Sequence, residues 1–182
     1  EEYNELFAEF RFQTVFRNNP SAHKMFLWWN FREFYNKKFK GNRNTKGMVT
    51  LNGMPKDYYY IFQSFLRPDH PILHLCGRHH FYRQFEPDNG IKAYSNASEV
   101  ELFINGKTQG KKKNGDYTQP DSFKKGRGNQ QITVPGAKIN NVFFWKALLK
   151  PERNHVLVRD NRGLSKRMII YQKASEGKMP VP

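Results

Sequence analysis

The chain has 182 residues, 15% of them aromatic, and this content of large apolar rings excludes an intrinsically disordered protein and is typical of a packed globular one. Lysine and arginine number 31 against 16 acidic residues, so the formal net charge of +15 favours anionic partners such as acidic polysaccharides or nucleic acids. No apolar run reaches the roughly 18 residues that cross a bilayer, so we expect no membrane partner. The single cysteine, Cys76, excludes an internal disulfide.

The first third of the chain has the pattern of an α/β layer. Residues 1 to about 18 carry apolar side chains at helical spacing, and the apolar run HKMFLWWNF at 23–31 predicts a buried β-strand. A polar loop extends to Lys46, and Pro55 then opens a second helical pattern rich in aromatic residues. Because one strand makes no sheet, we expect residues 1–67 to be the last portion of a larger α/β domain.

The pattern changes after residue 67, where two prolines in RPDHP indicate a boundary. Short β-type runs follow, separated by turn residues. Val100, Leu102 and Ile104 alternate on one face of such a run, and the NGK sequence that follows predicts a tight hairpin turn.

Seven β-type runs within residues 68–174 predict a β-sandwich of immunoglobulin-like type. The runs are ILHLC, GIKAYS, EVELFIN, QQITVP, NNVFFWKALL, HVLVRD and RMIIYQK. We expect a polar, lysine-rich loop at 111–128 and a flexible tail at 175–182.

The common catalytic and metal-binding motifs are not found in the sequence. No phosphate-binding glycine loop, nucleophile elbow or HExxH motif occurs. The segment HLCGRHH at 74–80 fits no common zinc spacing, so we interpret it as a strand followed by a turn and predict no metal. Glu33 follows the apolar run as a single carboxylate, which predicts an ion pair rather than catalysis, because glycoside cleavage requires two carboxyl groups.

Two adjacent tryptophans lie in the apolar run at 23–31. Neighbouring residues of a strand point to opposite faces, so at most one of Trp28 and Trp29 faces a binding site. Trp29 lies nearer the end of the run, where its ring could form an apolar platform under a sugar. The alternative is that both rings belong to the core.

The loop GNRNTKG at 41–47 is the candidate anion site. Asn44 offers an amide and Lys46 an ammonium group with three donors, and two residues spaced i, i+2 in an extended loop project to the same side. Together they could clamp a carboxylate or a sulfate. An ordinary solvated turn is the alternative, and composition alone favours it.

Several segments in a fixed order resemble the end of the catalytic (β/α)8 barrel of glycoside hydrolase family 2, and within it the β-glucuronidases most. They are the EEYNEL helix, the WWNFREF strand, the NRNTKG loop and the PKDYYY helix. The segments AYSNASEVELFINGKTQG and NNVFFWKALLKPERNHVLV resemble the immunoglobulin-like accessory domain that follows the barrel in many bacterial members. The resemblance covers nearly the whole chain and implies a barrel portion followed by a β-sandwich.

The resemblance also implies roles for individual residues. Trp29 matches the tryptophan that lines the sugar subsite, and Asn44 and Lys46 match the pair that holds the uronate carboxylate in β-glucuronidases. Lys40 falls where a basic residue could assist. Both catalytic glutamates of the family would lie upstream of Glu1, so we expect no catalytic residue in this chain.

The resemblance implies that this chain is the C-terminal part of a retaining, exo-acting enzyme that hydrolyses terminal β-D-glucuronides. A lysine in a small subsite is best compensated by a substrate carboxylate, because a buried unpaired charge is costly. A β-galactosidase of the same family is the alternative, and a non-catalytic carbohydrate-binding or structural module is the alternative of another class. Expected partners are a carbohydrate, the N-terminal remainder of the enzyme and, left open, a second copy. No cofactor is expected, and nucleic acid is the least favoured partner. A periplasmic, secreted or cytoplasmic bacterial location stays open.

Overall fold

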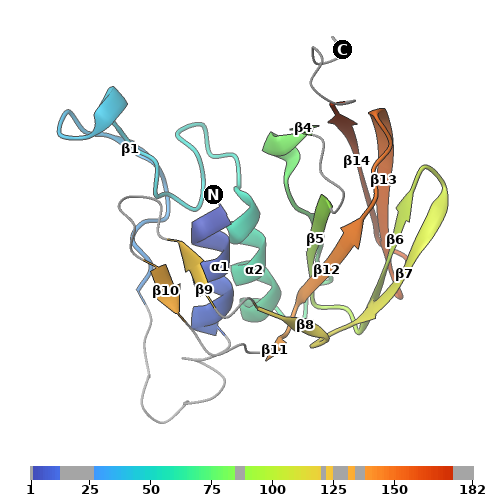
Figure 1. Ribbon diagram of the computed structural model, residues 1–182. Helices are drawn as coiled ribbons and strands as arrows, with labels where there is room; N and C mark the ends of the chain where they lie inside the picture. Colours follow the sequence, from blue (N-terminus) through green and yellow to red (C-terminus); the bar gives the residue numbers. More distant parts are fainter. Residues whose placement is uncertain are drawn as a thin grey trace.

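The computed structural model describes residues 2–12, 27–84, 89–119, 122–124, 131–133 and 138–173, and most of its regular structure is β-strand (Figure 1). The helices are α1 (Glu2–Arg11) and α2 (Asp57–Leu66), with the 3-10 turns η2 (Lys40–Asn42) and η3 (Arg78–His80). The strands are β1 (Phe34–Tyr35), β2 (Arg43–Asn44), β3 (Leu73–Leu75), β4 (Tyr82–Arg83), β5 (Asn89–Ser95), β6 (Glu99–Ile104), β7 (Lys107–Lys113), β8 (Tyr117–Thr118), β9 (Ser122–Lys124), β10 (Gln131–Thr133), β11 (Lys138–Ile139), β12 (Val142–Ala147), β13 (Glu152–Asp160) and β14 (Ser165–Gln172). Neither α1 nor α2 is long and apolar enough to cross a bilayer.

Two sheets face each other across one apolar core. The larger has the strand order β4-β14-β13-β6-β7, and the smaller has the order β12-β5-β3. Alternation along each strand sends every second side chain inward, so Leu102, Val158 and Ile170 of the larger sheet meet Ile91 and Phe143 of the smaller one. The seven predicted β-type runs each contain a strand, which confirms this part of the prediction.

The two helices cover the other face of the smaller sheet. Helices α1 and α2 run side by side next to β5 and β12 (Figure 1). A second apolar cluster joins Ala8 of α1, and Phe12 directly after this helix, to Tyr58 and Ile61 of α2 and to Tyr94 of β5. The helices therefore bury Tyr94 and Val142 on the second face of the smaller sheet, whereas Lys146 of β12 stays exposed on that face. The predicted boundary after residue 67 falls between α2 and β3 and stays a prediction.

The predicted strand at 23–31 is not a strand where the structure describes it. Residues 23–26 lie outside the described part, and Leu27, Trp29 and Phe31 are largely exposed. A β-strand needs a neighbouring strand that accepts and donates its backbone hydrogen bonds. Among the described residues, this segment pairs only with the short stretch around Val49, whose N–H donates to the carbonyl of Phe31 at 2.9 Å. The segment is apolar as the sequence shows, but a strand that is buried on both faces needs a flanking strand on each side.

The predicted polar loop at 111–128 is partly regular structure. Residues Lys111 to Lys113 belong to β7, and β8 and β9 follow within the same stretch. Strand β7 forms one edge of the larger sheet, and all its side chains are exposed. An edge strand of this kind shows no apolar alternation, so its pairing with β6 rather than its composition makes it a strand.

The hairpin predicted from NGK joins β6 to β7. Asn105 has φ of 51° and Gly106 has φ of 79°, which are the two left-handed residues of a type I′ turn. Replacing Gly106 by alanine should lower the free energy of unfolding by about 1 kcal/mol, because a Cβ disfavours this conformation. Urea denaturation measures the change. The neighbouring exposed Lys107→Ala should cost less than about 0.5 kcal/mol, and equal effects of the two changes would contradict the turn assignment.

Candidate functional site

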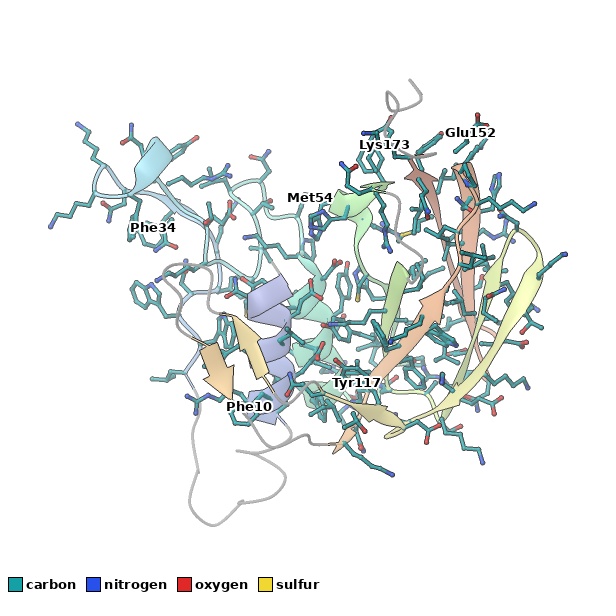
Figure 2. All side chains as sticks on the ribbon, viewed as in Figure 1. Phe10, Phe34, Met54, Tyr117, Glu152 and Lys173 are labelled. Atoms are coloured by element: carbon teal, nitrogen blue, oxygen red, sulfur yellow. The ribbon has the colours of Figure 1, made fainter. Side chains whose placement is uncertain are left out.

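The loop at 41–47 lies on an extension away from the sandwich. Strand β1 pairs with β2 in antiparallel register, with Phe34 opposite Asn44. Figure 2 shows Phe34 on this extension, at the far side of the helices from the larger sheet. Asn44 is therefore placed by a backbone ladder, whereas Lys46 lies in the turn just beyond it.

Asn44 and Lys46 have different environments. The Asn44 side chain is only 3% exposed, and its Oδ1 accepts the backbone N–H of Lys46 at 2.9 Å. Such an i to i+2 bond is the turn that asparagine forms with its own backbone. The Lys46 side chain is exposed. Asn44 thus shapes the turn and Lys46 presents the charge, and the joint binding of a ligand by both side chains stays a prediction.

Two side chains at the start of α2 support this turn from below. The Lys56 ammonium donates to the carbonyl of Thr45 at 2.8 Å, and it forms an ion pair with Glu33 at 2.5 Å. The Tyr58 hydroxyl contacts the carbonyl oxygens of Lys46 and Gly47. Lys56 and Tyr58 are buried, so the backbone of the loop is held from one side while its outer side stays open.

Gly47 brings the loop against the preceding segment. A Cβ at this position would lie 2.2 Å from the backbone nitrogen of Glu33, closer than any real contact, so only glycine fits here. Glu33 itself is buried, with Lys56 on one carboxylate oxygen and Arg43 at 3.6 Å from the other. The predicted ion-pair role of Glu33 is confirmed.

The two tryptophans have different environments. Trp29 is 72% exposed, with Phe34 at 6.4 Å between ring centroids. Trp28 packs against Phe62, with ring centroids 5.0 Å apart. Lys40 has its backbone in η2, and its side chain lies outside the described part.

A polar pocket of about 550 Å³ adjoins the loop. Glu33, Arg43, Thr45 and Lys56 line it, whereas Lys46 and Trp29 do not. Trp29 and Lys46 are therefore exposed outside this pocket, whereas the ion pair of Glu33 and Lys56 forms part of its wall.

Asp57, His74 and Cys76 are the described residues that could hold a metal, with ligand atoms within 4.8 Å of one another. The His74 ring bonds Asp57 Oδ1 at 2.7 Å, and the N–H of Gly77 donates to Asp57 Oδ2 at 2.6 Å. Burial alone would raise the pKa of Asp57, but these hydrogen bonds outweigh it and lower the pKa. Burial lowers the pKa of His74, so a neutral imidazole paired with a carboxylate links α2 to β3.

A second buried charge cluster joins α1 to β5. The Lys92 ammonium lies 2.9 Å from Glu9 Oε1 and 3.5 Å from Glu5 Oε2, and the Tyr94 hydroxyl donates to Glu9 at 2.7 Å. Burial alone would lower the pKa of Lys92, but the two carboxylates outweigh it and raise the pKa. Sequence reasoning missed this cluster, although the i, i+4 spacing of Glu5 and Glu9 puts both on one helix face.

Glu5 should make the stability of the protein depend on pH. Burial raises its pKa from 4.5 to about 7, despite the opposing charge of Lys92. Its contribution to stability is therefore complete below about pH 4.5 and is lost as the pH rises through about 7. Between pH 4.5 and 8 the unfolding free energy of Glu5→Gln should rise relative to wild type by at most about 3 kcal/mol.

Urea denaturation across this pH range tests the Glu5 prediction. The exposed Glu152→Gln serves as the control and should keep a constant difference from wild type. A Glu5→Gln difference that is equally flat would show that Glu5 titrates as an exposed carboxyl does.

The chain is similar to parts of proteins named as glycoside hydrolases. It is 28% identical over 130 residues to a β-glucuronidase of Bacteroides fragilis, covering 64% of this chain and 19% of that protein. It is 45% identical over 67 residues to the β-galactosidase BoGH2A of Bacteroides ovatus, covering 37% of this chain and 8% of that protein. The chain thus spans less than a fifth of the length of these relatives.

Two further comparisons concern the domain and the fold. Residues 90–132 match the model of a domain of unknown function, DUF4982. The fold matches the crystal structure of an FMN-binding β-glucuronidase from Faecalibacterium prausnitzii L2-6 with a TM-score of 0.69 and 22% identity, over 97% of this chain and 24% of that chain. The chain resembles the C-terminal region of family 2 glycoside hydrolases. The resemblance to family 2 predicted from the sequence is confirmed.

Proposed function

We propose that this chain contributes to a retaining, exo-acting family 2 enzyme that hydrolyses terminal β-D-glucuronides. In this proposal residues 1–67 end a (β/α)8 barrel, residues 68–174 form an immunoglobulin-like sandwich, and residues 175–182 are a tail. The observation that carries the proposal is the exposed ammonium of Lys46 on a loop that Asn44, Lys56 and Tyr58 hold in place.

Lys46 would bind the uronate carboxylate of the substrate. An ammonium and a carboxylate form a charge-assisted hydrogen bond, about twice as strong as a neutral one. Asn44 would fix the direction of the Lys46 backbone, and Lys40 would add positive charge nearby. The exposed ring of Trp29 would pack against the C–H face of the sugar.

Bond cleavage would be the task of two carboxyl groups in the part of the enzyme that precedes Glu1. A retaining glycosidase holds an acid/base and a nucleophile about 5–5.5 Å apart and passes through a covalent glycosyl-enzyme intermediate. This chain would bind and orient the sugar, and it would supply no proton to the glycosidic oxygen.

A β-galactosidase is the second candidate function. The relative BoGH2A, 45% identical over 67 residues, supports it. The charge of Lys46 favours the uronide, because a galactoside has no carboxylate to compensate an ammonium in the subsite.

The discriminating experiment uses the enzyme that contains this chain together with its preceding residues. Its kcat/KM is measured on an aryl β-D-glucuronide and on the matching aryl β-D-galactoside. We expect the glucuronide to be preferred by at least about 100-fold, the factor that about 3 kcal/mol of charge-assisted binding supplies. Preference for the galactoside would establish the second candidate, and hydrolysis of neither substrate would contradict both.

A further inference from the structure

The larger sheet has an outer face that no described element covers. Because side chains alternate, Phe103, Leu157, Ile169 and Tyr171 point away from the core and are half-buried. Together with their cationic neighbours they form what we call the outer face. A groove of about 670 Å³ runs over it, and Phe103, Leu157 and Ile169 contribute to its lining. The smaller sheet and the helices lie on the opposite side of the larger sheet (Figure 1).

Arginine and histidine side chains lie beside these apolar positions. Arg167 lies opposite Leu157, His155 lies opposite Ile169, and Arg153 lies opposite Tyr171. All three are exposed, as is Arg159, and among the described residues none of the three arginines forms an ion pair with an acidic side chain.

Two acidic residues of β6, Glu99 and Glu101, lie on this face. The Glu99 carboxylate pairs with the Lys111 ammonium at 3.0 Å, and Glu101 lies opposite Arg159 and accepts a hydrogen bond from the Thr108 hydroxyl at 2.7 Å. Arg153 and Arg167 lie in other cross-strand rows than these carboxylates, so the outer face has an apolar middle with exposed positive charge beside it.

Aromatic rings lie in two separate cross-strand rows of this face. The Arg159 guanidinium lies over the Phe103 ring at 5.8 Å from its centroid. Tyr82 and Tyr171 stack with their centroids 5.3 Å apart. Arg167 and Tyr171 are four residues apart on β14, so their Cα atoms lie about 13 Å apart at the usual rise of a strand. Figure 2 labels Glu152 and Lys173 at the end of β13 and β14 where the tyrosine pair lies.

We propose that the outer face is a binding site for a glycan chain that carries carboxylate groups, separate from the Lys46 loop. The arginines would take the carboxylates in bidentate hydrogen bonds, which guanidinium groups form well. The half-buried apolar strip of Leu157 and Ile169 would pack against the C–H faces of the sugar rings between them.

Charge complementarity favours an acidic glycan over the other anionic polymer that the net charge attracts. The phosphates of a nucleic-acid strand form the backbone that links its units, so a strand along the outer face would bring phosphates over Leu157 or Ile169, where they would lose water without gaining a partner. An acidic glycan links its units through neutral ring ethers and carries each carboxylate at the margin of a ring. Its C–H faces can therefore lie on the apolar strip while its carboxylates reach the arginines. The proposal does not depend on which sugar the enzyme cleaves.

Binding of the full chain to polygalacturonate, to neutral pullulan and to oligo-dT tests the proposal by affinity electrophoresis. We expect retention by polygalacturonate that weakens with salt, and no retention by pullulan. The variant Arg159→Gln/Arg167→Gln should bind polygalacturonate roughly tenfold more weakly, and Phe103→Leu severalfold more weakly.

The control variant Lys138→Gln/Lys150→Gln removes two exposed charges away from the outer face. It should change binding less than twofold, although its net charge equals that of the arginine variant. Equal losses in the two variants would assign the binding to diffuse charge and overturn the proposal. Tighter binding to oligo-dT, or a dimer that the arginine variant dissociates in sedimentation, would also overturn it. Unchanged urea unfolding midpoints establish that each variant is folded.

Discussion

Lys46→Ala should reduce kcat/KM of the enzyme for an aryl β-D-glucuronide on the order of 10²-fold, which corresponds to about 3 kcal/mol for one lost charge-assisted hydrogen bond. The exposed side chain of Lys46 makes no contact that its loop needs, because Asn44, Lys56 and Tyr58 hold the backbone. The loss should therefore appear in substrate binding rather than in folding. Activity on the matching galactoside should change less than about threefold.

Two further variants separate charge recognition from a general effect on the loop. Lys46→Arg keeps the positive charge and should retain a larger share of the glucuronide activity than alanine does. Lys38→Ala removes another exposed lysine of the same extension and should leave both activities unchanged. Equal losses on glucuronide and galactoside in Lys46→Ala would contradict uronate recognition by this residue.

Lys92→Met should lower the free energy of unfolding by about 3–5 kcal/mol, because it removes the cation that two buried carboxylates face. Lys92 lies 2.9 Å from Glu9, whose side chain is fully buried, and 3.5 Å from Glu5. Without the ammonium, one or both glutamates must take up a proton or open the contact between α1 and β5. Urea denaturation at pH 7 measures the loss.

The matched control is Lys146→Met on the neighbouring strand β12, where the lysine is exposed. It should change the unfolding free energy by less than about 0.5 kcal/mol. The triple variant Lys92→Met/Glu5→Gln/Glu9→Gln should regain much of the lost stability, since no uncompensated charge stays buried. A Lys92→Met protein within about 1 kcal/mol of wild type would show that the cluster is hydrated.

The parts of the fold that could be predicted are those whose signal is local. Strand β6 and its hairpin were predicted correctly, because their signals lie in a few consecutive residues. These signals are the alternation of Val100, Leu102 and Ile104 and the positive φ angles that the NGK turn requires. The same holds for the other β-type runs. The family resemblance was also predictable, because it rests on several motifs in a fixed order.

The parts that could not be predicted depend on residues far apart in the sequence. Glu5 and Glu9 look like solvated helix positions until Lys92, more than eighty residues later, is brought against them by β5. Lys56 likewise looks like an ordinary helix-start cation until Glu33 and the Thr45 carbonyl meet its ammonium. Each of these contacts forms only when the chain folds, and no pattern of neighbouring residues in the sequence indicates it.

The candidate loop shows both kinds of inference. The sequence predicts Asn44 as a substrate-binding residue, and that role stays a prediction. Its burial and its bond to the Lys46 backbone follow from the register of β1 and β2, which the sequence does not reveal. The short strand β1 has no alternation of its own to predict. The roles of Asn44, Lys46, Trp29 and Lys40 toward a sugar stay predictions until the enzyme is assayed.

The close approach of Gly47 to the backbone of Glu33 limits how this loop can evolve. Its path cannot be moved inward, and any side chain at position 47 would force it outward and separate Tyr58 from the carbonyls it contacts. Positions 45 and 46, by contrast, carry exposed side chains on a fixed backbone. In the proposed function, exchanges at positions 45 and 46 would therefore alter the sugar preference without moving the backbone of the loop, whereas an exchange at position 47 would move it.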